Sequence, residues 1–243
     1  MKMLTFASRN TKEILRDPLN LCFGLGFPLV LILLLSAIQA NIPVPLFEIE
    51  HLAPGIAVFG LSFMTLFSGT LVAKDRTSSL LQRLYTTPMK PLDFILGYTL
   101  PLLPISLMQS VICYVVAFFL GLAPSVHILS ALLFILPISL LFVAFGLLFG
   151  SILNDKAVGG VCGALMTNLT AWLSGIWFDL ELVGGVFRKV AYALPFVHAV
   201  ELERAVIAYE YSKVLPHFLV VLAYAIGTLA VAVFLFVRQM KKQ

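Results

Sequence analysis

Long uncharged apolar runs recur along the chain, and short polar stretches separate them. Each of six runs holds about 20 or more residues without Asp, Glu, Lys or Arg; they cover residues 19–38, 52–73, 94–120, 128–153, 157–178 and 215–237. A helix needs about 20 mostly apolar residues to cross the hydrocarbon core of a bilayer. The pattern therefore predicts an all-α integral membrane protein with six transmembrane helices in a single domain.

The composition supports this prediction and excludes other classes of protein. Only 12% of the residues are charged and 60% are hydrophobic, whereas soluble domains carry about 25% charged residues. A soluble enzyme, a nucleic-acid-binding domain and a disordered chain are therefore excluded, and the lipid bilayer is the first expected partner. The three cysteines lie inside apolar runs without CxxC or Cys/His spacing, so we expect neither a metal site nor a disulfide framework.

The basic residues fall mainly on one side of the six predicted helices. That side holds Lys2, Arg9, Lys12, Arg16, Lys74, Arg76, Arg83, Lys90, Lys156, Arg238, Lys241 and Lys242. The other side holds only Arg188, Lys189, Arg204 and Lys213. Cytoplasmic loops carry the excess of Lys and Arg. The distribution predicts a multi-pass protein of the cell inner (cytoplasmic) membrane with both termini in the cytoplasm.

The segment before the first run predicts an amphipathic helix over residues 4–17, lying in the cytoplasmic interface and stopped by Pro18. Its apolar positions recur at helical spacing, at Leu4, Ala7, Ile14 and Leu15. The alternative is a solvated tail whose basic residues only hold the protein's orientation in the membrane.

The connection after the second run, KDRTSSLLQRLYTTPMKP, predicts a short helix over residues 77–87. Thr77 or Ser78 can cap its start and Pro88 ends it. Its apolar ridge consists of Leu80, Leu81 and Leu84. Such a ridge between basic flanks is a candidate docking element for another protein. The alternative is a loop helix that packs on its own bundle.

The connection before the last run is too apolar for a simple soluble loop. Gly184–Gly185 and Pro195 divide it into short helical pieces, which predicts a re-entrant or interfacial segment over residues 182–208. Its candidate functional residues are Phe187, Pro195, His198, Glu201 and Arg204. We interpret Glu201, Glu203 and Arg204 as acid–base pairs within this segment rather than as substrate ligands.

Three stretches of the chain resemble the membrane subunits of type-2 ABC exporters. They are RDP at residues 16–18, KDRTSSLLQRLYTTPMKPLDFILG at residues 74–97 and LPFVHAVELERAV at residues 194–206. The resemblance covers essentially the whole chain. It departs from the family pattern at Lys74, Arg76 and Ser78, where the family often has Glu, Glu and Gly, and it lacks a proline after Trp177-Phe178-Asp179.

The resemblance implies a single transmembrane permease domain over residues 1–243. Such a subunit forms the translocation pathway as a dimer, with a second copy or a paralogue, and sits on ABC ATP-binding subunits. It has no catalytic site, and ATP and magnesium belong to the partner. By the same resemblance, the N-terminal helix and the loop helix contact the ATPase, through Arg16, Asp75, Arg76, Leu80, Leu81, Leu84 and Pro88.

The residues themselves limit what the chain can do alone. The sequence has no GxxxxGK[ST] motif, so we expect this chain to bind no cofactor and any ATP-derived energy to come from a partner. The predicted spans carry no Asp, Glu, Lys or Arg, which weakens the alternatives of an ion-coupled secondary transporter or channel and of a membrane enzyme.

The polar residues inside the predicted spans are uncharged. Candidates to line the pathway are Ser62, Thr65, Thr167 and Asn168. They suit an amphiphilic substrate such as a drug, lipid, glycan or peptide, and hydrogen bonding between helices is the alternative role. Small residues at Gly146, Gly150 and 159–163 predict close helix packing.

Overall fold

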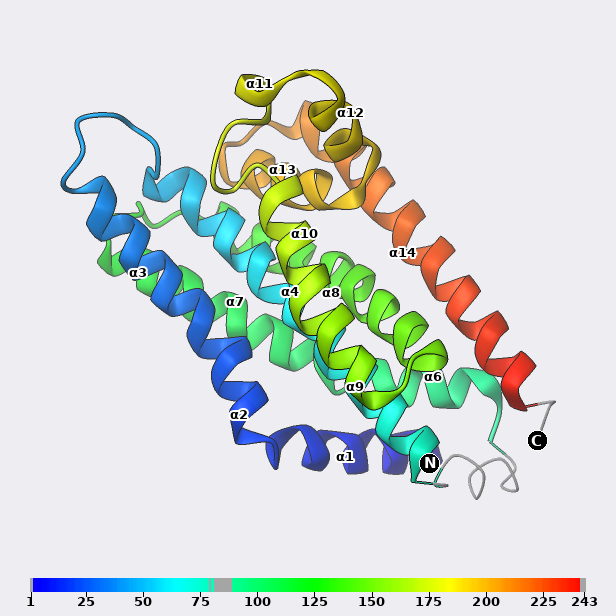
Figure 1. The fold of residues 1–243 in the computed structure, drawn as a ribbon. Coiled ribbons are helices and arrows are strands. Elements are labelled where there is room, and N and C mark those ends of the chain that lie inside the picture. The colour runs from blue at the N-terminus through cyan, green and yellow to red at the C-terminus, as the bar shows by residue number, and fades with distance from the viewer. Residues whose placement is uncertain (1, 79, 81–88, 241–243) are drawn as a thin grey trace.

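The computed structural model describes residues 2–78, 80 and 89–240, and this part of the chain is helical without any strand. Most of its helices run lengthwise in one bundle (Figure 1). Among the described residues, five helical stretches are long and apolar enough to cross a membrane. They are α2–η1–α3 (Pro18–Leu21, Cys22–Gly26 and Phe27–Gln39), α4 (Ile49–Thr77), α6–α7 (Pro91–Thr99 and Leu102–Phe119), α8 (His127–Ile152) and α14 (Tyr211–Met240).

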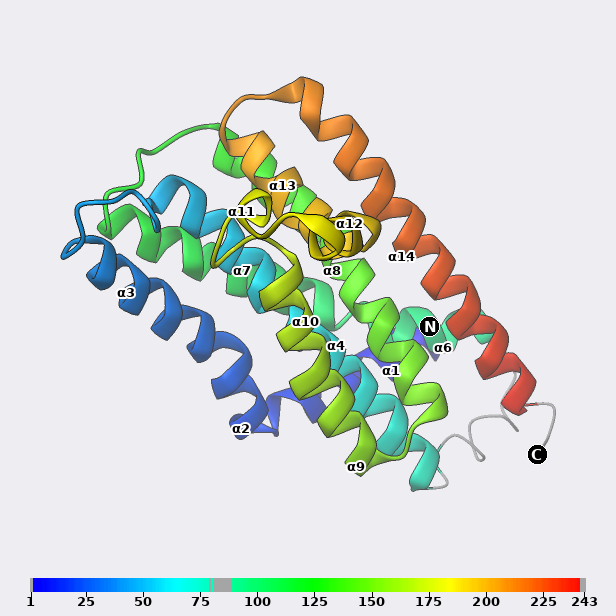
Figure 2. The same ribbon diagram turned by 45° about the horizontal axis from the view of Figure 1, so that its top comes forward.

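The predicted span at residues 157–178 forms a less apolar helical run. It consists of α9 (Asp155–Val158), the π-helical η2 (Gly159–Leu165) and α10 (Met166–Leu173). This run lies beside α4 (Figures 1 and 2). It ends before Gly175, whose φ of 72° lies in the left-handed region that breaks a helix. The helix is thus shorter than predicted, and the six-span topology stays a prediction.

Proline divides the third predicted span into two helices. α6 ends at Thr99 and α7 begins at Leu102, with Pro101 between them. A proline lacks the backbone N–H that would continue the ladder, and its ring clashes with the preceding turn. Pro137, in contrast, lies inside the unbroken α8.

The centre of the bundle is the crossing of α4 and α8. A Cβ atom on Gly146 would overlap Ser68 Oγ and the Thr65 carbonyl, and one on Gly150 would lie 2.6 Å from the Gly69 carbonyl oxygen. The close packing predicted at Gly146 and Gly150 is therefore confirmed.

The same prediction is wrong at Gly159 and Gly160. A Cβ atom on either residue would meet nothing within 4 Å. Gly163 is intermediate, because its Cβ would lie in ordinary contact with Leu66.

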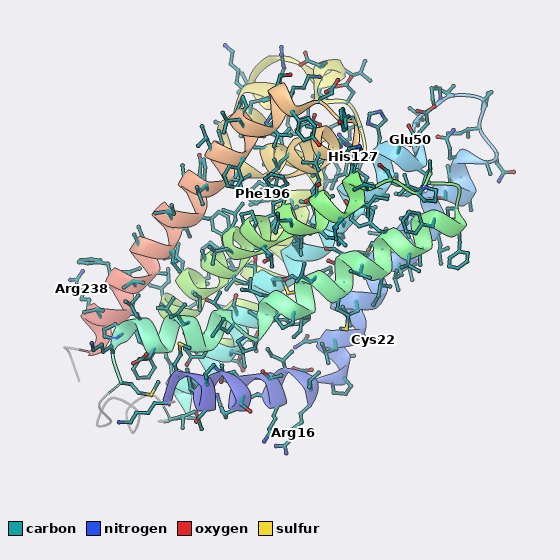
Figure 3. All side chains as sticks on the ribbon, turned by 180° about the vertical axis from the view of Figure 1, so that it is seen from behind. Arg16, Cys22, Glu50, His127, Phe196 and Arg238 are labelled. Atoms are coloured by element: carbon teal, nitrogen blue, oxygen red, sulfur yellow. The ribbon has the colours of Figure 1, made fainter. Side chains whose placement is uncertain are left out.

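The two ends of the bundle differ. α1 (Lys2–Leu15) lies across one end, where both ends of the described chain also lie (Figure 1). Arg16 and Arg238 lie toward this end, whereas Glu50 and His127 lie toward the opposite end (Figure 3). We call residues 180–207 the end-cap segment; it comprises α11 (Leu180–Val183), α12 (Gly185–Ala193) and α13 (Pro195–Ile207).

Candidate functional site

α1 is a helix packed on the bundle, which excludes the solvated tail as its description. Its buried residues are Phe6, Ala7, Asn10 and Ile14. Phe6 packs edge-on against Tyr98, with ring centroids 5.0 Å apart. Leu4 and Leu15, predicted on the apolar face, are 61% and 59% exposed. At 3.6 residues per turn, Leu4 and Leu15 lie roughly 105° and 125° around the helix from the centre of the buried face.

A buried carboxylate fixes α1 to the bundle. Asp75, near the end of α4, is 1% exposed. Its Oδ2 accepts hydrogen bonds from Arg9 Nη1 at 2.7 Å and from the Tyr98 hydroxyl at 2.9 Å. Asn10 Nδ2 donates to the Gly97 carbonyl at 3.0 Å. Because Tyr98 and Gly97 belong to α6, the network joins α1, α4 and α6.

The residues on either side of Asp75 in the sequence contact two further parts of the structure. Lys74 Nζ lies 3.8 Å from Asp17 Oδ2, at the junction of α1 and α2. Arg76 Nη1 donates to the carbonyls of Gly150 at 2.7 Å and Leu153 at 3.1 Å, at the C-terminal end of α8. A cation is favoured there by the carbonyls left without helical partners.

These contacts revise the expected role of the charged cluster. Asp75 is buried by this chain's own helices, so it offers no surface to a partner and acts by positioning α1. The side chain of Arg76 likewise holds α8. Arg16 is exposed just after α1, which leaves it available for a partner.

The first residue of the predicted loop helix belongs to α4. Thr77 is the last residue of α4, and its hydroxyl donates to the Ala73 and Lys74 carbonyls. Ser78 is the C-cap of α4. The prediction that Thr77 caps a new helix is therefore wrong, whereas a cap at Ser78 stays a prediction because residues 79 and 81–88 lie outside the described residues. Leu80 is helical and half-buried, whereas Leu81, Leu84 and Pro88 lie outside the described residues.

The end-cap segment is broken into separate helices at the positions that the sequence predicts. Gly184 and Gly185 have φ values of 61° and 56°, which favour glycine, and Pro195 is the first residue of α13. α13 is inserted among α4, α8 and α14, with most of its residues buried. Phe187 of α12 packs against Phe178, with ring centroids 6.1 Å apart.

The predicted acid–base pairing is confirmed for one of the two acids. Arg204 Nη1 lies 3.0 Å from Glu201 Oε1, and its other nitrogens donate to the Gly175 and His51 carbonyls at 3.1 and 3.3 Å. His198 Nδ1 lies 2.8 Å from His217 Nδ1, which links α13 to α14.

Glu203 is not part of that pairing. It is 0% exposed, and its Oε2 accepts a hydrogen bond of 3.0 Å from the Tyr114 hydroxyl of α7. Its Oε1 has no hydrogen-bond partner in the described chain. Burial raises the pKa of this carboxyl well above its usual value. The signal in the sequence is helical spacing, which puts residue 203 on the same face as Phe196 and Val200.

An aromatic cavity of about 660 Å³ lies between α3, α4 and the η2–α10 run. Its walls are Phe23, Phe27, Leu31, Phe59, Phe63, Gly163, Ala164, Thr167, Asn168, Ala171, Trp172, Trp177 and Phe178. Two of the predicted pathway residues, Thr167 and Asn168, therefore lie on its wall. Ser62 and Thr65 do not; both are 0% exposed, and Thr65 Oγ1 donates to the Phe142 carbonyl at 2.9 Å.

A second cavity, which we call the acidic cavity, has a volume of about 730 Å³ and lies under the end-cap segment. Charged and titratable residues on its wall are Glu48, His51, Asp179, Tyr192, Glu201, Arg204, Glu210 and Lys213. Trp177 and Phe178 line both cavities. The apolar aromatic cavity thus adjoins the charged acidic cavity. In the described chain, no group of three or more His, Cys, Asp or Glu residues is arranged to hold a metal ion.

α1, the end-cap segment and every bundle helix except α14 lie in a region with a family counterpart. The model of the ABC-2 type transporter family matches residues 1–208. The chain belongs to this family. This ABC-2 transporter is accordingly a multi-pass membrane component of an ABC transporter. The matched residues include the Asp75 network and α13, and most of the wall of both cavities. A search of curated proteins gives no match to the ABC-2 transporter described here.

Proposed function

We propose that this ABC-2 transporter is the permease subunit of an ATP-driven exporter of amphiphilic substrates. It has no catalytic site of its own and is coupled to a separate ATP-binding subunit, which carries ATP and magnesium. It forms the pathway as a dimer, with a second copy or a paralogue. Six spans leave both termini on the cytoplasmic side of the inner membrane.

The observation that carries the proposal is the attachment of α1 to α4. α1 lies across the base-rich end of the bundle, and Asp75 holds it through Arg9. α4 continues from Asp75 to Phe63 and Phe59 on the wall of the aromatic cavity. The rise of 1.5 Å per residue puts these rings about 18 and 24 Å from Asp75. α4 therefore connects α1, which we assign to contact with the partner, with the aromatic cavity, which we assign to the substrate.

The aromatic cavity supports the substrate class. Its wall is almost entirely apolar, with Thr167 and Asn168 as its polar side chains. Such a chamber suits a ligand that is largely apolar and carries a few polar groups. It provides no charged ligand set for a small inorganic ion.

The proposal is tested by reconstituting the chain in inside-out vesicles with and without an ATP-binding subunit. We expect uptake of a fluorescent amphiphile only when both subunits and hydrolysable ATP are present. A vanadate-inhibited complex is the matched control. Uptake that follows an imposed proton gradient without ATP would instead show an ion-coupled secondary transporter.

A further inference from the structure

The aromatic and acidic cavities share one segment of wall. The aromatic cavity is lined by seven aromatic rings and by no charged side chain. Two of those rings, Trp177 and Phe178, also line the acidic cavity. They belong to the connection between α10 and α11, and this connection leads into the end-cap segment (Figure 2). A ligand at this boundary would contact both environments.

The acidic cavity has an excess of negative charge. Its wall carries four carboxylates and two cationic side chains. Each cation is already paired, Arg204 with Glu201 at 3.0 Å and Lys213 with Glu210 at 2.6 Å. Glu48 and Asp179 have no ion-pair partner in the described chain. The cavity therefore presents two carboxylates without a cation.

The aromatic rings at the boundary add a second source of attraction for a cation. Trp177 and Tyr192 line the acidic cavity, and the π-faces of such rings attract ammonium and phosphonium groups. The ring of Tyr192 already lies 5.6 Å from the guanidinium of Arg188, which is itself paired with Glu181. An anion would meet like charge in the same place, and a neutral ligand would gain nothing from the two carboxylates.

We propose that the joined cavities bind an amphiphilic organic cation, with its aromatic body in the aromatic cavity and its positive charge next to Glu48 and Asp179. The inference rests on the proposed function, because it assigns the two cavities to the substrate pathway. It narrows the substrate class from amphiphiles in general to aromatic cations.

The chain contains a built-in probe of this site. Its two tryptophans are Trp172 and Trp177, and both line the aromatic cavity. Intrinsic tryptophan fluorescence therefore reports ligand binding without a label. The matched ligands are tetraphenylphosphonium and tetraphenylborate, which have nearly the same size and apolar surface and carry opposite charge. The protein is the full chain in nanodiscs of zwitterionic lipid, so that lipid charge does not bias the comparison.

We expect the phosphonium ion to bind at least about tenfold more tightly than the borate ion. Glu48→Gln and Asp179→Asn should each weaken phosphonium binding by about three- to tenfold, and added salt should reduce this difference. Asn at position 179 can still accept the hydrogen bond from the Glu181 amide. Glu50→Gln is the matched control: it removes an exposed carboxylate of α4 that lies off the cavity wall.

The outcomes separate this inference from the proposed function. Equal binding of the two ions, or an unchanged phosphonium Kd in the double variant Glu48→Gln/Asp179→Asn, would overturn the inference. Unchanged tryptophan emission and gel-filtration volume of the unliganded variants verify their fold. The binding assay needs neither ATP nor a partner. Selective phosphonium binding without ATP-dependent transport would therefore contradict only the proposed function.

Discussion

Replacing Arg9 by alanine should weaken the attachment of α1 to the bundle. The substitution removes the hydrogen bond of 2.7 Å to Asp75, whose carboxylate is 1% exposed. The Arg9 side chain itself is 36% exposed, so solvent screens part of the interaction. A charge-assisted hydrogen bond contributes about 1.5–3 kcal/mol, and the exposure of Arg9 favours the lower half of that range. We expect α1 to lose about 2 kcal/mol of local stability.

Hydrogen exchange of the α1 amides measures this loss directly. At 1.4 kcal/mol per factor of ten, a loss of 2 kcal/mol raises the exchange rates about thirtyfold. The amides of α8, which Arg9 does not contact, should keep their rates. Arg9→Lys should recover part of the protection, because the ammonium group retains the charge but not the geometry of the guanidinium group.

A matched control and a double-mutant cycle test the contribution of the Arg9–Asp75 pair. Lys12→Ala removes an exposed cation from the same helix and should change α1 exchange by less than about threefold. The cycle with Asp75→Asn should give a coupling energy of at least about 1 kcal/mol. Equal exchange in Arg9→Ala and Lys12→Ala, or a coupling energy near zero, would refute the role assigned to this pair.

Two further substitutions test the buried part of the bundle. Glu203→Gln should cost less than about 1 kcal/mol, whereas Glu203→Ala should cost about 2–4 kcal/mol because it leaves a cavity and an unpaired Tyr114 hydroxyl. Because the folded-state pKa of Glu203 is raised, wild-type stability should fall as the pH rises above about 4.5, and thermal unfolding of Glu203→Gln should lack this slope; equal slopes would contradict it. Gly146→Ala should cost about 1–3 kcal/mol because its Cβ would overlap Ser68 Oγ. Gly159→Ala, which meets open space, should be neutral or stabilising in the same unfolding assay.

The sequence predicts most helices well because length and apolar content set them locally. The observed α4 and α8 include the predicted runs 52–73 and almost all of 128–153. The breaks at Gly184–Gly185 and Pro195 follow from backbone chemistry that each residue carries wherever it lies.

The directions of individual side chains could not be predicted, because they depend on which helix lies opposite. The buried face of α1 turns toward Phe94 and Tyr98 of α6, so Phe6 packs there and Leu4 does not. Asp75 lies at the start of the predicted cytoplasmic connection, yet α4 continues to Thr77, and Asp75 is buried. Only the packed bundle brings its carboxylate next to Arg9, 66 residues earlier in the chain.

The residues that line the two cavities also could not be predicted from the sequence. Helical spacing alone indicates neither that Thr167 and Asn168 face the aromatic cavity nor that Ser62 and Thr65 face away from it. The segments that carry Glu48, Asp179 and Lys213 meet only in the folded chain. The charge excess of the acidic cavity therefore has no local signature in the sequence.

The proposed function requires that the Asp75 network couple an ATP-binding partner to the aromatic cavity. The most direct test is the number of substrate molecules transported per ATP hydrolysed by the complex of both subunits, compared between wild type and Asp75→Asn. We expect the variant complex to assemble and to hydrolyse ATP at its basal rate, while transport per ATP falls at least about tenfold. An unchanged ratio in a variant whose α1 exchanges rapidly would contradict it.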